Sequence, residues 1–371
     1  MTRILHVLTS PRAEGTPRLV LDWLTVPGHE QGVAFLTGEP ADLLGDFRQS
    51  GCWLQVGDSV VPGPRKFLEI ARTVRGWVRA FEPEVVIAWP TGFSHWIFLG
   101  ARAARSRAAL LSHGGNPPGR GWRDRYLMTW VCLWTTALCG GRLVACSRYV
   151  QRLFTRIPLV PASRIGFAYN SLRADGIVRR AGAARAARVA GGPFRALMVA
   201  TLESHKDHAT LIRAVRLLQD RSVTIEVWLV GAGQLETGLK SLAAGLGVER
   251  AVKFLGTRRD VPELLGQCDV FVFSTTPQEG RPAAVCEALA AGLPVIASDV
   301  EPLRELLEDG QWGVLVPAGD PAALAGALQN AMAETSQAAR TDDDQTAARQ
   351  AFAAGFNCER MLSDYLREAR A

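Results

Sequence analysis

Two glutamates eight residues apart are the side chains in this sequence best placed to do chemistry. Glu279 and Glu287 lie in the segment QEGRPAAVCEALAAGLPVIASD, residues 278–299. Pro282 suits the start of a helix and Gly292 suits its end, so the spacing predicts a short helix between them. Because nearly every other side chain of this helix is small or apolar, we expect the helix to be buried and Glu287 to be its one polar group.

A buried carboxylate needs hydrogen-bond donors, and the hydroxyls of a ribose could supply two of them. Glu279 lies in the loop before the helix, where Gly280 leaves the backbone open to a ligand. The free amides of the first helical turn would attract an anion. This pattern favours a ligand with phosphates, a sugar and a ribose. In the alternative interpretation, Glu279 is a solvated turn residue and Glu287 pairs with an arginine of the core.

The segment resembles the Glu-(seven residues)-Glu signature of retaining glycosyltransferases of family 4, which have the GT-B fold. The matching positions are Glu279, Gly280, Pro282, Glu287, Ala288, Gly292, Pro294 and Val295. The resemblance implies that Glu279 contacts the transferred sugar and that Glu287 binds the ribose of the nucleotide. It also implies that the helix start binds the nucleotide sugar, through Gly280, Arg281, Pro282 and Ala283.

A second segment, VATLESHKDHATLIRAV at 199–215, resembles the strand, loop and helix that hold the diphosphate in this family. Lys206 falls at the position of the phosphate-binding lysine, and an ammonium there could neutralise a departing diphosphate. Thr201 stands where the family usually has an arginine, and Arg281 is a candidate substitute. Without the resemblance, Lys206 could equally be a solvated residue at a helix start. The turn expected to meet the nucleobase consists of Gly256, Thr257 and Arg258.

The first half of the chain resembles the family more loosely. His113 ends an apolar run and precedes two glycines, where the family often has a histidine that reaches the donor sugar. The alternative is a histidine that caps the end of a strand. Gly15 is the residue retained from the family's glycine-rich first loop.

Motifs for a bound metal or a dinucleotide are weak. The only Asp-x-Asp pattern is the run 342–344, in a polar stretch that we interpret as solvated, so we expect no metal and no cofactor apart from the nucleotide-sugar co-substrate. The Gly231-Ala232-Gly233 run lacks the third glycine of a dinucleotide fingerprint, because Glu236 occupies that position.

The elements that position these residues alternate between short apolar strands and helical stretches in both halves of the chain. This alternation predicts an α/β protein with two Rossmann-like domains, each with its own parallel sheet, and the resemblance implies that they face each other across a cleft. We expect an acceptor-binding domain over 1–172, a linker over 173–192 rich in Ala, Arg and Gly, a donor-binding domain over 193–345, and a C-terminal helix over 346–371 that crosses back to the first domain.

Charge is divided unevenly between the halves of this 371-residue chain. Residues 1–190 carry 25 basic and 12 acidic side chains, whereas the remainder carries 17 and 24. Residues 101–190 hold 16 arginines, and the uncharged part of 122–142 contains tryptophans. Trp beside Arg suits a lipid headgroup region, so we predict contact of residues 101–190 with an anionic membrane surface. The alternative is a buried helix with a rim of arginines. Nucleic acid is disfavoured, because the aromatics lie within apolar runs.

The sequence excludes several other classes of protein. Apolar residues make up 48% and charged residues 21%, which is typical of a folded chain. No run of 18 apolar residues occurs, and the first strand is too short for a secretory signal, so we expect a cytoplasmic protein that, through the predicted membrane contact, is peripheral at the inner face of the membrane. The seven cysteines include no CxxC pair, which argues against a disulfide framework.

The predicted function is transfer of a hexose from a UDP- or GDP-linked sugar to a glycan or lipid-linked acceptor, with retention and without a metal. Two alternatives stay open. One is an epimerase or hydrolase of nucleotide sugars on the same fold, and the other is a non-catalytic protein that binds a nucleotide or a glycan.

Overall fold

The structure is a computed structural model of the chain that describes every residue except 13–14, 59–64, 90, 119–121, 190 and 338–341. The chain divides into two compact units. Unit 1 comprises Met1–Ser171 and Cys358–Ala371, and unit 2 comprises Leu172–Asn357. Each unit has its own parallel sheet covered by helices, so the predicted pair of Rossmann-like domains is confirmed.

Unit 1 is built on a parallel sheet in the order β3-β2-β1-β4-β5-β6-β7. Its strands are β1 (Thr2–Leu8), β2 (His29–Phe35), β3 (Trp53–Val56), β4 (Val85–Ala88), β5 (Ala109–Gly114), β6 (Arg142–Ala145) and β7 (Ile165–Phe167). Its α-helices are α1 (Gly15–Trp23), α2 (Leu44–Gln49), α3 (Arg65–Phe81), α4 (Ser94–Ala103), α5 (Trp122–Leu133), α6 (Arg148–Thr155) and α15 (Cys358–Arg370).

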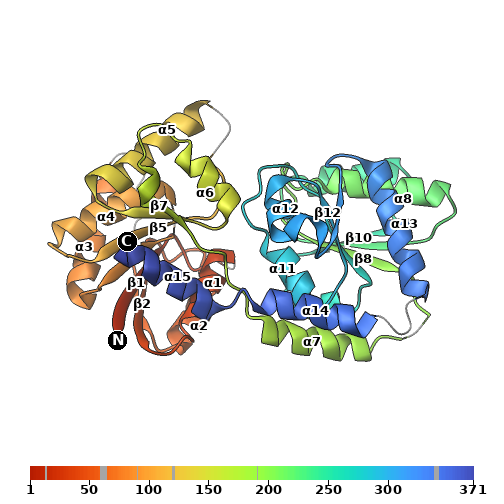
Figure 1. Cartoon of the computed structure of the whole chain (residues 1–371), viewed down its shortest axis with the longest axis horizontal. Helices are drawn as coiled ribbons and strands as arrows, with labels where there is room; N and C mark the ends of the chain where they lie inside the picture. Colours follow the sequence, from red (N-terminus) through yellow and green to blue (C-terminus); the bar gives the residue numbers. More distant parts are fainter. Residues whose placement is uncertain (13–14, 59–64, 90, 119–121, 190, 338–341) are drawn as a thin grey trace. The chain divides into compact units, whose positions relative to one another are not determined.

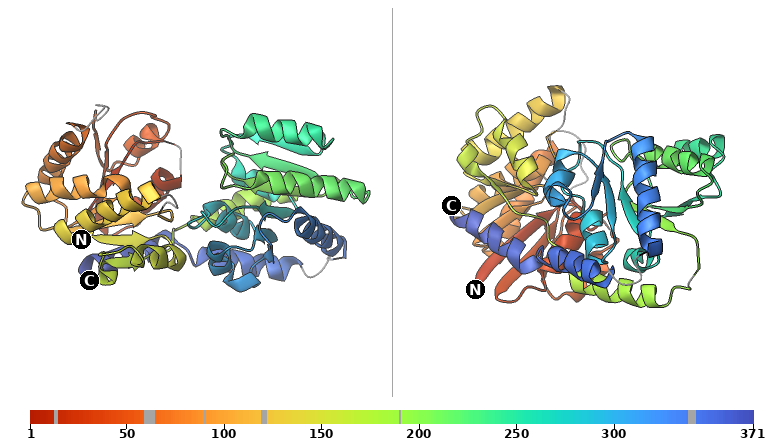
Figure 2. Two further views of the ribbon diagram at one scale, coloured as in Figure 1. Left: turned by 90° about the horizontal axis from the view of Figure 1, so that it is seen from above. Right: turned by 45° about the vertical axis from the view of Figure 1, so that its right-hand side comes forward.

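Helices cover both faces of this sheet, which explains why its strands are apolar throughout. Ile4 and Leu8 of β1 pack in one cluster with α1, α2 and α15. Leu5 and Val7 of the same strand pack in another cluster with α3 and α4. Figures 1 and 2 show α15, in dark blue, beside the amino-terminal strands although it comes from the far end of the chain.

Unit 2 repeats this plan with strand order β10-β9-β8-β11-β12-β13. Its strands are β8 (Arg195–Val199), β9 (Glu226–Val230), β10 (Val252–Gly256), β11 (Val270–Phe273), β12 (Val295–Ser298) and β13 (Val314–Val316). One face packs against α7 (Ala174–Ala186), α10 (Val261–Gly266), α11 (Ala283–Ala290), α12 (Glu301–Leu306) and α14 (Asp342–Ala354). The other face packs against α8 (His208–Asp220), α9 (Glu236–Gly245) and α13 (Pro321–Gln337).

The linker predicted over 173–192 is wrong for most of its length, because this segment forms α7 of unit 2. Ala174, Ile177 and Ala181 are buried in the core of that unit. Alanine and arginine are strong helix formers, and the small side chains recur at helical spacing on one face. A composition rich in Ala and Arg therefore marked a helix packed on the domain rather than a flexible connection.

The prediction of a single C-terminal helix over 346–371 is also corrected, because non-helical residues at Gly355–Asn357 divide it into two helices. The helix before the break, α14, belongs to unit 2, and α15 after it belongs to unit 1. The polar stretch that contains the acidic run 342–344 enters α14, which the structure describes from Asp342 onwards.

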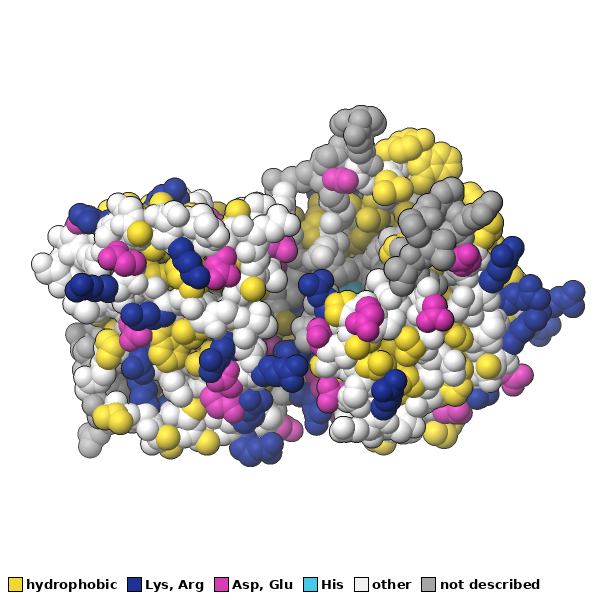
Figure 3. Space-filling view, turned by 180° about the vertical axis from the view of Figure 1, so that it is seen from behind, with side chains coloured by type: hydrophobic (Ala, Val, Ile, Leu, Met, Phe, Trp, Pro, Cys, Tyr) yellow, Lys and Arg dark blue, Asp and Glu magenta, His cyan; other side chains and the backbone are white. Residues whose placement is uncertain are grey.

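Unit 1 carries exposed apolar side chains along α5 and the π-helical turn Trp134–Leu138 that continues it. The exposed members are Tyr126, Leu127, Trp130, Trp134 and Leu138. Hydrophobic side chains gather in the space-filling view at the edge of the unit where α5 lies (Figures 1 and 3). The alternative of a buried helix with a rim of arginines does not hold for these exposed residues. No helix in the described part of the chain has the length and apolar character needed to cross a bilayer.

Candidate active site

Two loops of unit 2 meet at the carboxyl ends of β8 and β11. These strands are neighbours in the sheet, with Ala196 opposite Val270 and Leu197 opposite Phe271. The strand order reverses between them, because the chain builds outwards from β8 in one direction and from β11 in the other. Parallel α/β sheets bind ligands at such a reversal, just beyond the carboxyl ends of the strands.

The loop after β8 supplies Lys206 and the loop after β11 supplies Glu279, and the two side chains form an ion pair. Both are largely buried, with 13% of the Lys206 side chain and 7% of the Glu279 side chain exposed. The hydroxyl of Thr275 lies 3.4 Å from Oε1 of Glu279, and Nε2 of His205 lies 3.7 Å from the same oxygen. The structure thus brings together two predicted site residues that are 73 positions apart.

Hydrogen bonds hold these two loops against each other. The amide of Asp207 donates to the carbonyl of Ser274 at 3.0 Å, and the amide of Thr276 donates to the carbonyl of His205 at 3.0 Å. The Thr275 hydroxyl also donates to the carbonyl of His205, at 2.8 Å. The positions of Lys206 and Glu279 are therefore fixed by backbone contacts and do not depend on their ion pair alone.

The helix after the Lys206 loop begins with a turn that is capped by a carboxylate and contains a buried histidine. Asp207 is the N-cap of α8 and accepts a hydrogen bond from the amide of Thr210 at 3.1 Å. Nδ1 of the fully buried His208 lies 2.9 Å from the carbonyl of Lys206, so Nδ1 must carry the hydrogen. Burial lowers the pKa of His208 below its usual value, and this ring adds no positive charge beside Lys206 at neutral pH.

The Gly231-Ala232-Gly233 run has a packing role in this site. A Cβ atom at Gly231 would lie 2.0 Å from the carbonyl oxygen of Ala200, and one at Gly233 would lie 2.4 Å from that of Leu202. The amide of Leu202 donates to the carbonyl of Ala232 at 3.1 Å. The glycines therefore allow the loop after β9 to support the loop that carries Lys206.

Glu287 differs from its predicted environment. It is only half-buried on α11, so the fully buried helix with one enclosed carboxylate is not what the chain forms. The nearly enclosed carboxylate is Glu279, which is 6% exposed. The helix bounds match the prediction closely: Pro282 is the N-cap of α11, and Gly292 follows its end with a φ of 78°. Seven-residue spacing from a loop to a helix does not fix how deeply each carboxylate lies.

The other predicted donor-binding residues of unit 2 lie in three different environments. The Arg281 guanidinium is buried, 4.1 Å above the ring of Phe356, and is therefore enclosed within unit 2. Thr201 is exposed directly after β8, and Ala283 is exposed at the first turn of α11. The base-binding turn follows β10, where Gly256 has a φ of 65°, Thr257 is exposed and Arg258 pairs with Asp260.

In unit 1, His113 lies on β5 and is almost completely buried. Its Nδ1 is 2.6 Å from the hydroxyl of Tyr365, which α15 carries to this position, and its ring centroid is 4.9 Å from that of Trp89. Burial lowers the pKa of His113 to about 4, so the ring is neutral at pH 7. Gly15 begins α1 and is exposed, and part of the loop before it lies outside the described residues.

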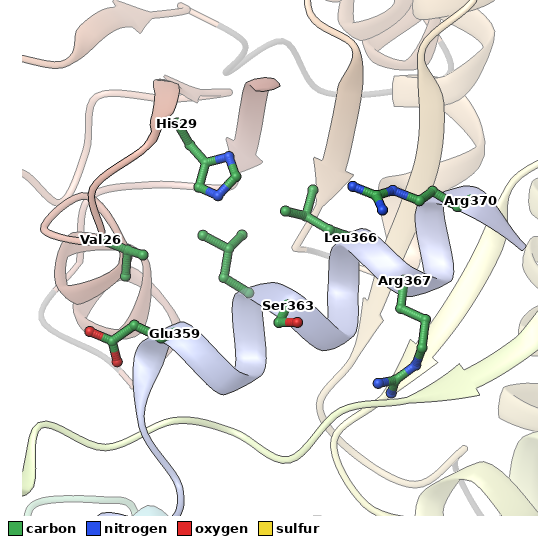
Figure 4. Close-up of a pocket in the computed structure, with 8 residues that line it drawn as sticks. Val26, His29, Glu359, Ser363, Leu366, Arg367 and Arg370 are labelled. Atoms are coloured by element: carbon green, nitrogen blue, oxygen red, sulfur yellow. The ribbon is translucent and has the colours of Figure 1, made fainter. Parts of the chain in front are cut away.

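A separate cavity of about 360 Å³ opens in unit 1 beside α15 (Figure 4). It is lined by Val26, His29, Glu359, Leu362, Ser363, Leu366, Arg367 and Arg370. Since His29 begins β2, this cavity lies at the amino ends of the strands, away from the edge where Rossmann-like sheets bind ligands. Among the described residues, no group of His, Cys, Asp and Glu is arranged to hold a metal ion.

Three side chains of these sites were not predicted from the sequence. His205 contacts Glu279 and directly precedes the predicted Lys206, so its position was a usable signal. Thr275 ends the apolar run that forms β11, and a hydroxyl at the carboxyl end of a strand was a second signal. Tyr365 lies in the predicted C-terminal helix, and nothing local in the sequence indicates that its hydroxyl reaches His113.

Comparison with known proteins agrees with this geometry. Residues 193–334 match the family model described as glycosyl transferases group 1. This segment of unit 2 is a glycosyl transferase group 1 domain. It contains both Lys206 and Glu279, so the ion pair lies within the matched domain. The predicted resemblance to glycosyltransferases is confirmed at this level, whereas the finer assignment to family 4 stays a prediction.

Relatives extend the likeness beyond this domain. The chain is 35% identical to the amylovoran biosynthesis glycosyltransferase AmsK of Erwinia amylovora over an aligned stretch of 143 residues. This stretch covers 37% of this chain and 35% of AmsK. It thus spans about a third of that relative's length. It is 26% identical over 306 residues to the lipopolysaccharide core biosynthesis glycosyltransferase LpsD of Rhizobium meliloti, covering 81% of this chain and 80% of LpsD.

Solved structures share the whole architecture. The crystal structure of Anabaena Alr3699/HepE in complex with UDP and glucose superposes with a TM-score of 0.78 at 18% identity, covering 100% of this chain and 99% of that one. The chain therefore has the GT-B fold, with a Rossmann-like domain in each unit.

Proposed function

We propose that this chain transfers a hexose from a nucleoside-diphosphate sugar, UDP- or GDP-linked, to a glycan or lipid-linked acceptor, with retention of anomeric configuration. The observation that supports this most is the Lys206–Glu279 pair at the strand-order reversal of the group 1 domain. A cation and a carboxylate held side by side suit a ligand that carries a diphosphate next to a sugar.

In this proposal the ligand separates the ion pair, and each of the two side chains binds a group of the ligand instead. The diphosphate takes the ammonium of Lys206, and Glu279 accepts hydrogen bonds from the hydroxyls of the sugar. Thr275 and His205 remain beside Oε1 of Glu279 and hold the carboxylate in place. The first-turn amides of α11, next to Gly280 and Pro282, provide further donors for phosphate oxygens. Glu287, farther along α11, is proposed to bind the ribose.

The bond between the anomeric carbon and the diphosphate oxygen breaks as negative charge grows on the leaving group. Lys206 stabilises that charge in a largely buried setting, where a charge interaction is stronger than in water. The acceptor oxygen bonds to the anomeric carbon on the face from which the diphosphate departs, and the acceptor proton passes to the leaving phosphate. No metal ion is needed in this scheme, and we expect activity to survive chelation.

The acceptor class is proposed from the relatives. AmsK is named for amylovoran biosynthesis and LpsD for lipopolysaccharide core biosynthesis, and HepE was crystallised with UDP and glucose. Unit 1 is proposed to bind the acceptor, with His113 near the donor sugar or the acceptor hydroxyl. A growing polysaccharide or a glycolipid fits these observations best.

Product analysis tests the proposed function. Purified protein is incubated with UDP- and GDP-linked hexoses, with and without a mixture of glycan and polyprenyl-linked acceptors, and products are separated by mass. We expect a sugar–acceptor adduct that requires the acceptor. A changed or hydrolysed donor in the absence of acceptor would identify an epimerase or hydrolase, and tight nucleotide binding without turnover would identify a binding protein.

We further propose that the exposed stripe along α5 contacts an anionic membrane, at the inner face where a lipid-linked acceptor would be found. Trp130, Trp134 and their exposed apolar neighbours belong to the arginine-rich range 101–190. Aromatic side chains beside basic ones suit the headgroup region. In flotation with vesicles of phosphatidylglycerol, replacing Trp130 and Trp134 by serine should weaken binding about 10-fold. Equal flotation of wild type and variant would contradict this contact.

A further inference from the structure

Tyr365 reaches His113 from the other end of the chain. The two residues are 252 positions apart, yet the hydroxyl of Tyr365 and Nδ1 of His113 are 2.6 Å apart. Tyr365 is completely buried on α15 and His113 is 4% exposed on β5. A hydrogen bond this deep in unit 1 is not exchanged with water, so it governs where the imidazole points.

An aromatic cage fixes both rings. Trp23 packs edge-on against Tyr365 with ring centroids 5.1 Å apart, and Trp89 stacks over Tyr365 at 6.0 Å. Trp89 also packs against His113, at 4.9 Å. Close packing of Trp89 and Tyr365 against the imidazole leaves it little rotational freedom.

The helix that carries Tyr365 is anchored independently of this contact. Arg142 on β6 donates to Glu368 at 2.7 Å, and a Cβ atom on Gly166 of β7 would collide with the Glu368 carboxylate. The amide of Ser171 lies 3.1 Å from Sδ of Met361. Anchors on both sides of Tyr365 along α15 place its hydroxyl without help from His113.

The direction of the hydrogen bond follows from the available partners. Among the described residues, His113 is the one hydrogen-bond partner of the Tyr365 hydroxyl, so the hydroxyl hydrogen points to Nδ1. Nδ1 is then an acceptor and Nε2 carries the hydrogen of the neutral ring. Nε2 faces the backbone after β5, because a Cβ atom on Gly115 would lie 3.0 Å from it.

We propose that Tyr365 is a positioning residue: it holds His113 as the Nε2–H tautomer, with this N–H directed to the carboxyl end of β5 as an uncharged donor to a sugar oxygen. This inference rests on the proposed function. A neutral donor suits a hydroxyl or ring oxygen, whereas the phosphates are met by Lys206 in unit 2. Burial keeps both groups uncharged, since it lowers the pKa of His113 to about 4 and raises the pKa of Tyr365.

A double-mutant cycle on the full chain tests the proposal. Tyr365→Phe keeps the ring in its cage and removes only the hydroxyl. We expect it to lower kcat/KM about 10-fold, in line with a lost orienting hydrogen bond. In a His113→Ala background the same change should alter kcat/KM less than 2-fold, because the group it orients is gone. Ser363→Ala, on another face of α15 beside the cavity in Figure 4, is the matched control and should leave kcat/KM unchanged.

Nitrogen-15 NMR of the histidine rings supplies a readout that does not depend on turnover. In the wild type we expect the His113 signals of an unprotonated Nδ1 and a protonated Nε2, and in Tyr365→Phe a mixture of tautomers. A protonated Nδ1 in the wild type overturns the proposal, as do independent, additive effects in the cycle. A wild type that transfers no sugar would overturn the proposed function and this role together, whereas normal transfer with additive effects would overturn this role alone.

Discussion

The carboxyl edges of the two sheets are equipped in opposite ways. In unit 2 the edge carries a charged pair, Lys206 with Glu279, held by two adjacent loops. In unit 1 the edge carries a neutral pair, His113 with Tyr365, held by a strand and a helix from opposite ends of the chain. Both pairs are largely buried, so the difference lies in charge and not in access.

Under the proposed function, this contrast assigns different tasks in the transfer reaction to the two units. A leaving diphosphate develops charge and needs a cation close by, whereas a sugar or its acceptor offers uncharged hydroxyls that need neutral, directed donors. A buried charge must be paired, and unit 2 pairs its lysine with a carboxylate, which the diphosphate of the ligand replaces in the proposed function. The His113–Tyr365 pair of unit 1 carries no charge, because burial keeps the histidine unprotonated.

The largest effect expected from this comparison is on turnover. Glu279→Ala or Lys206→Ala should lower kcat at least ~100-fold, since each removes a contact to the reacting sugar or the departing diphosphate. Lys240→Ala is the matched control, because Lys240 pairs with Glu236 on the exposed surface of α9 in the same unit. Steady-state rates with the active donor, compared among the wild type, the site variants and Lys240→Ala, measure this effect. Rates near wild type in both site variants would remove the charged pair from the mechanism.

A smaller expected effect concerns the stability of unit 1 at acidic pH. The pKa of His6 and of His113 is lowered to about 4 by burial, so the unfolded chain binds protons first as the pH falls below about 6.5. Each histidine should therefore cost unit 1 about 2 kcal/mol of unfolding free energy between pH 7 and pH 5. Urea unfolding followed by hydrogen exchange in β1 and β5 measures this loss. Stability of unit 1 that stays level over this interval would refute the neutral state of both rings.

The smallest expected effect is a gain in affinity for a nucleoside diphosphate. Thr201 is exposed after β8, where the resemblance places an arginine, so Thr201→Arg should fit without disturbing the core. A new guanidinium near Lys206 should tighten binding of a nucleoside diphosphate about 5-fold, as expected for one partly solvated charge-assisted contact. Calorimetric titration of wild type and variant gives the comparison. Unchanged or weaker affinity would place the diphosphate away from the loop after β8.

Much of unit 2 was predictable because its strands and helices are indicated by residues that are close together in the sequence. Each apolar run became a parallel strand, and a helix formed between Pro282 and Gly292. The resemblance implied that Lys206 and Glu279 bind the diphosphate and the sugar of one ligand, but their ion pair and the strand order that brings their loops together come from the structure. Burial of Glu287 was wrong, since the depth of a side chain depends on what packs over its helix.

Unit 1 was less predictable because its key contact is not local. His113 could be chosen from the residues around it in the sequence. Its partner Tyr365 lies on α15, and the sequence did not show that α15 is separate from α14 and belongs to unit 1. The segment of α7 shows the same limit. Its composition was interpreted as a linker although alanine and arginine favour a helix, and the packing of Ala174, Ile177 and Ala181 makes this helix part of the core of unit 2.

The central claim is that the loops holding Lys206 and Glu279 bind a nucleoside diphosphate. Isothermal titration of the wild type, Lys206→Ala and Lys240→Ala with UDP, GDP and ADP tests it most directly. We predict that one of these nucleotides binds the wild type and Lys240→Ala with equal affinity, and binds Lys206→Ala at least 10-fold more weakly. Equal affinity in all three proteins, or no binding of any nucleotide, would contradict the claim.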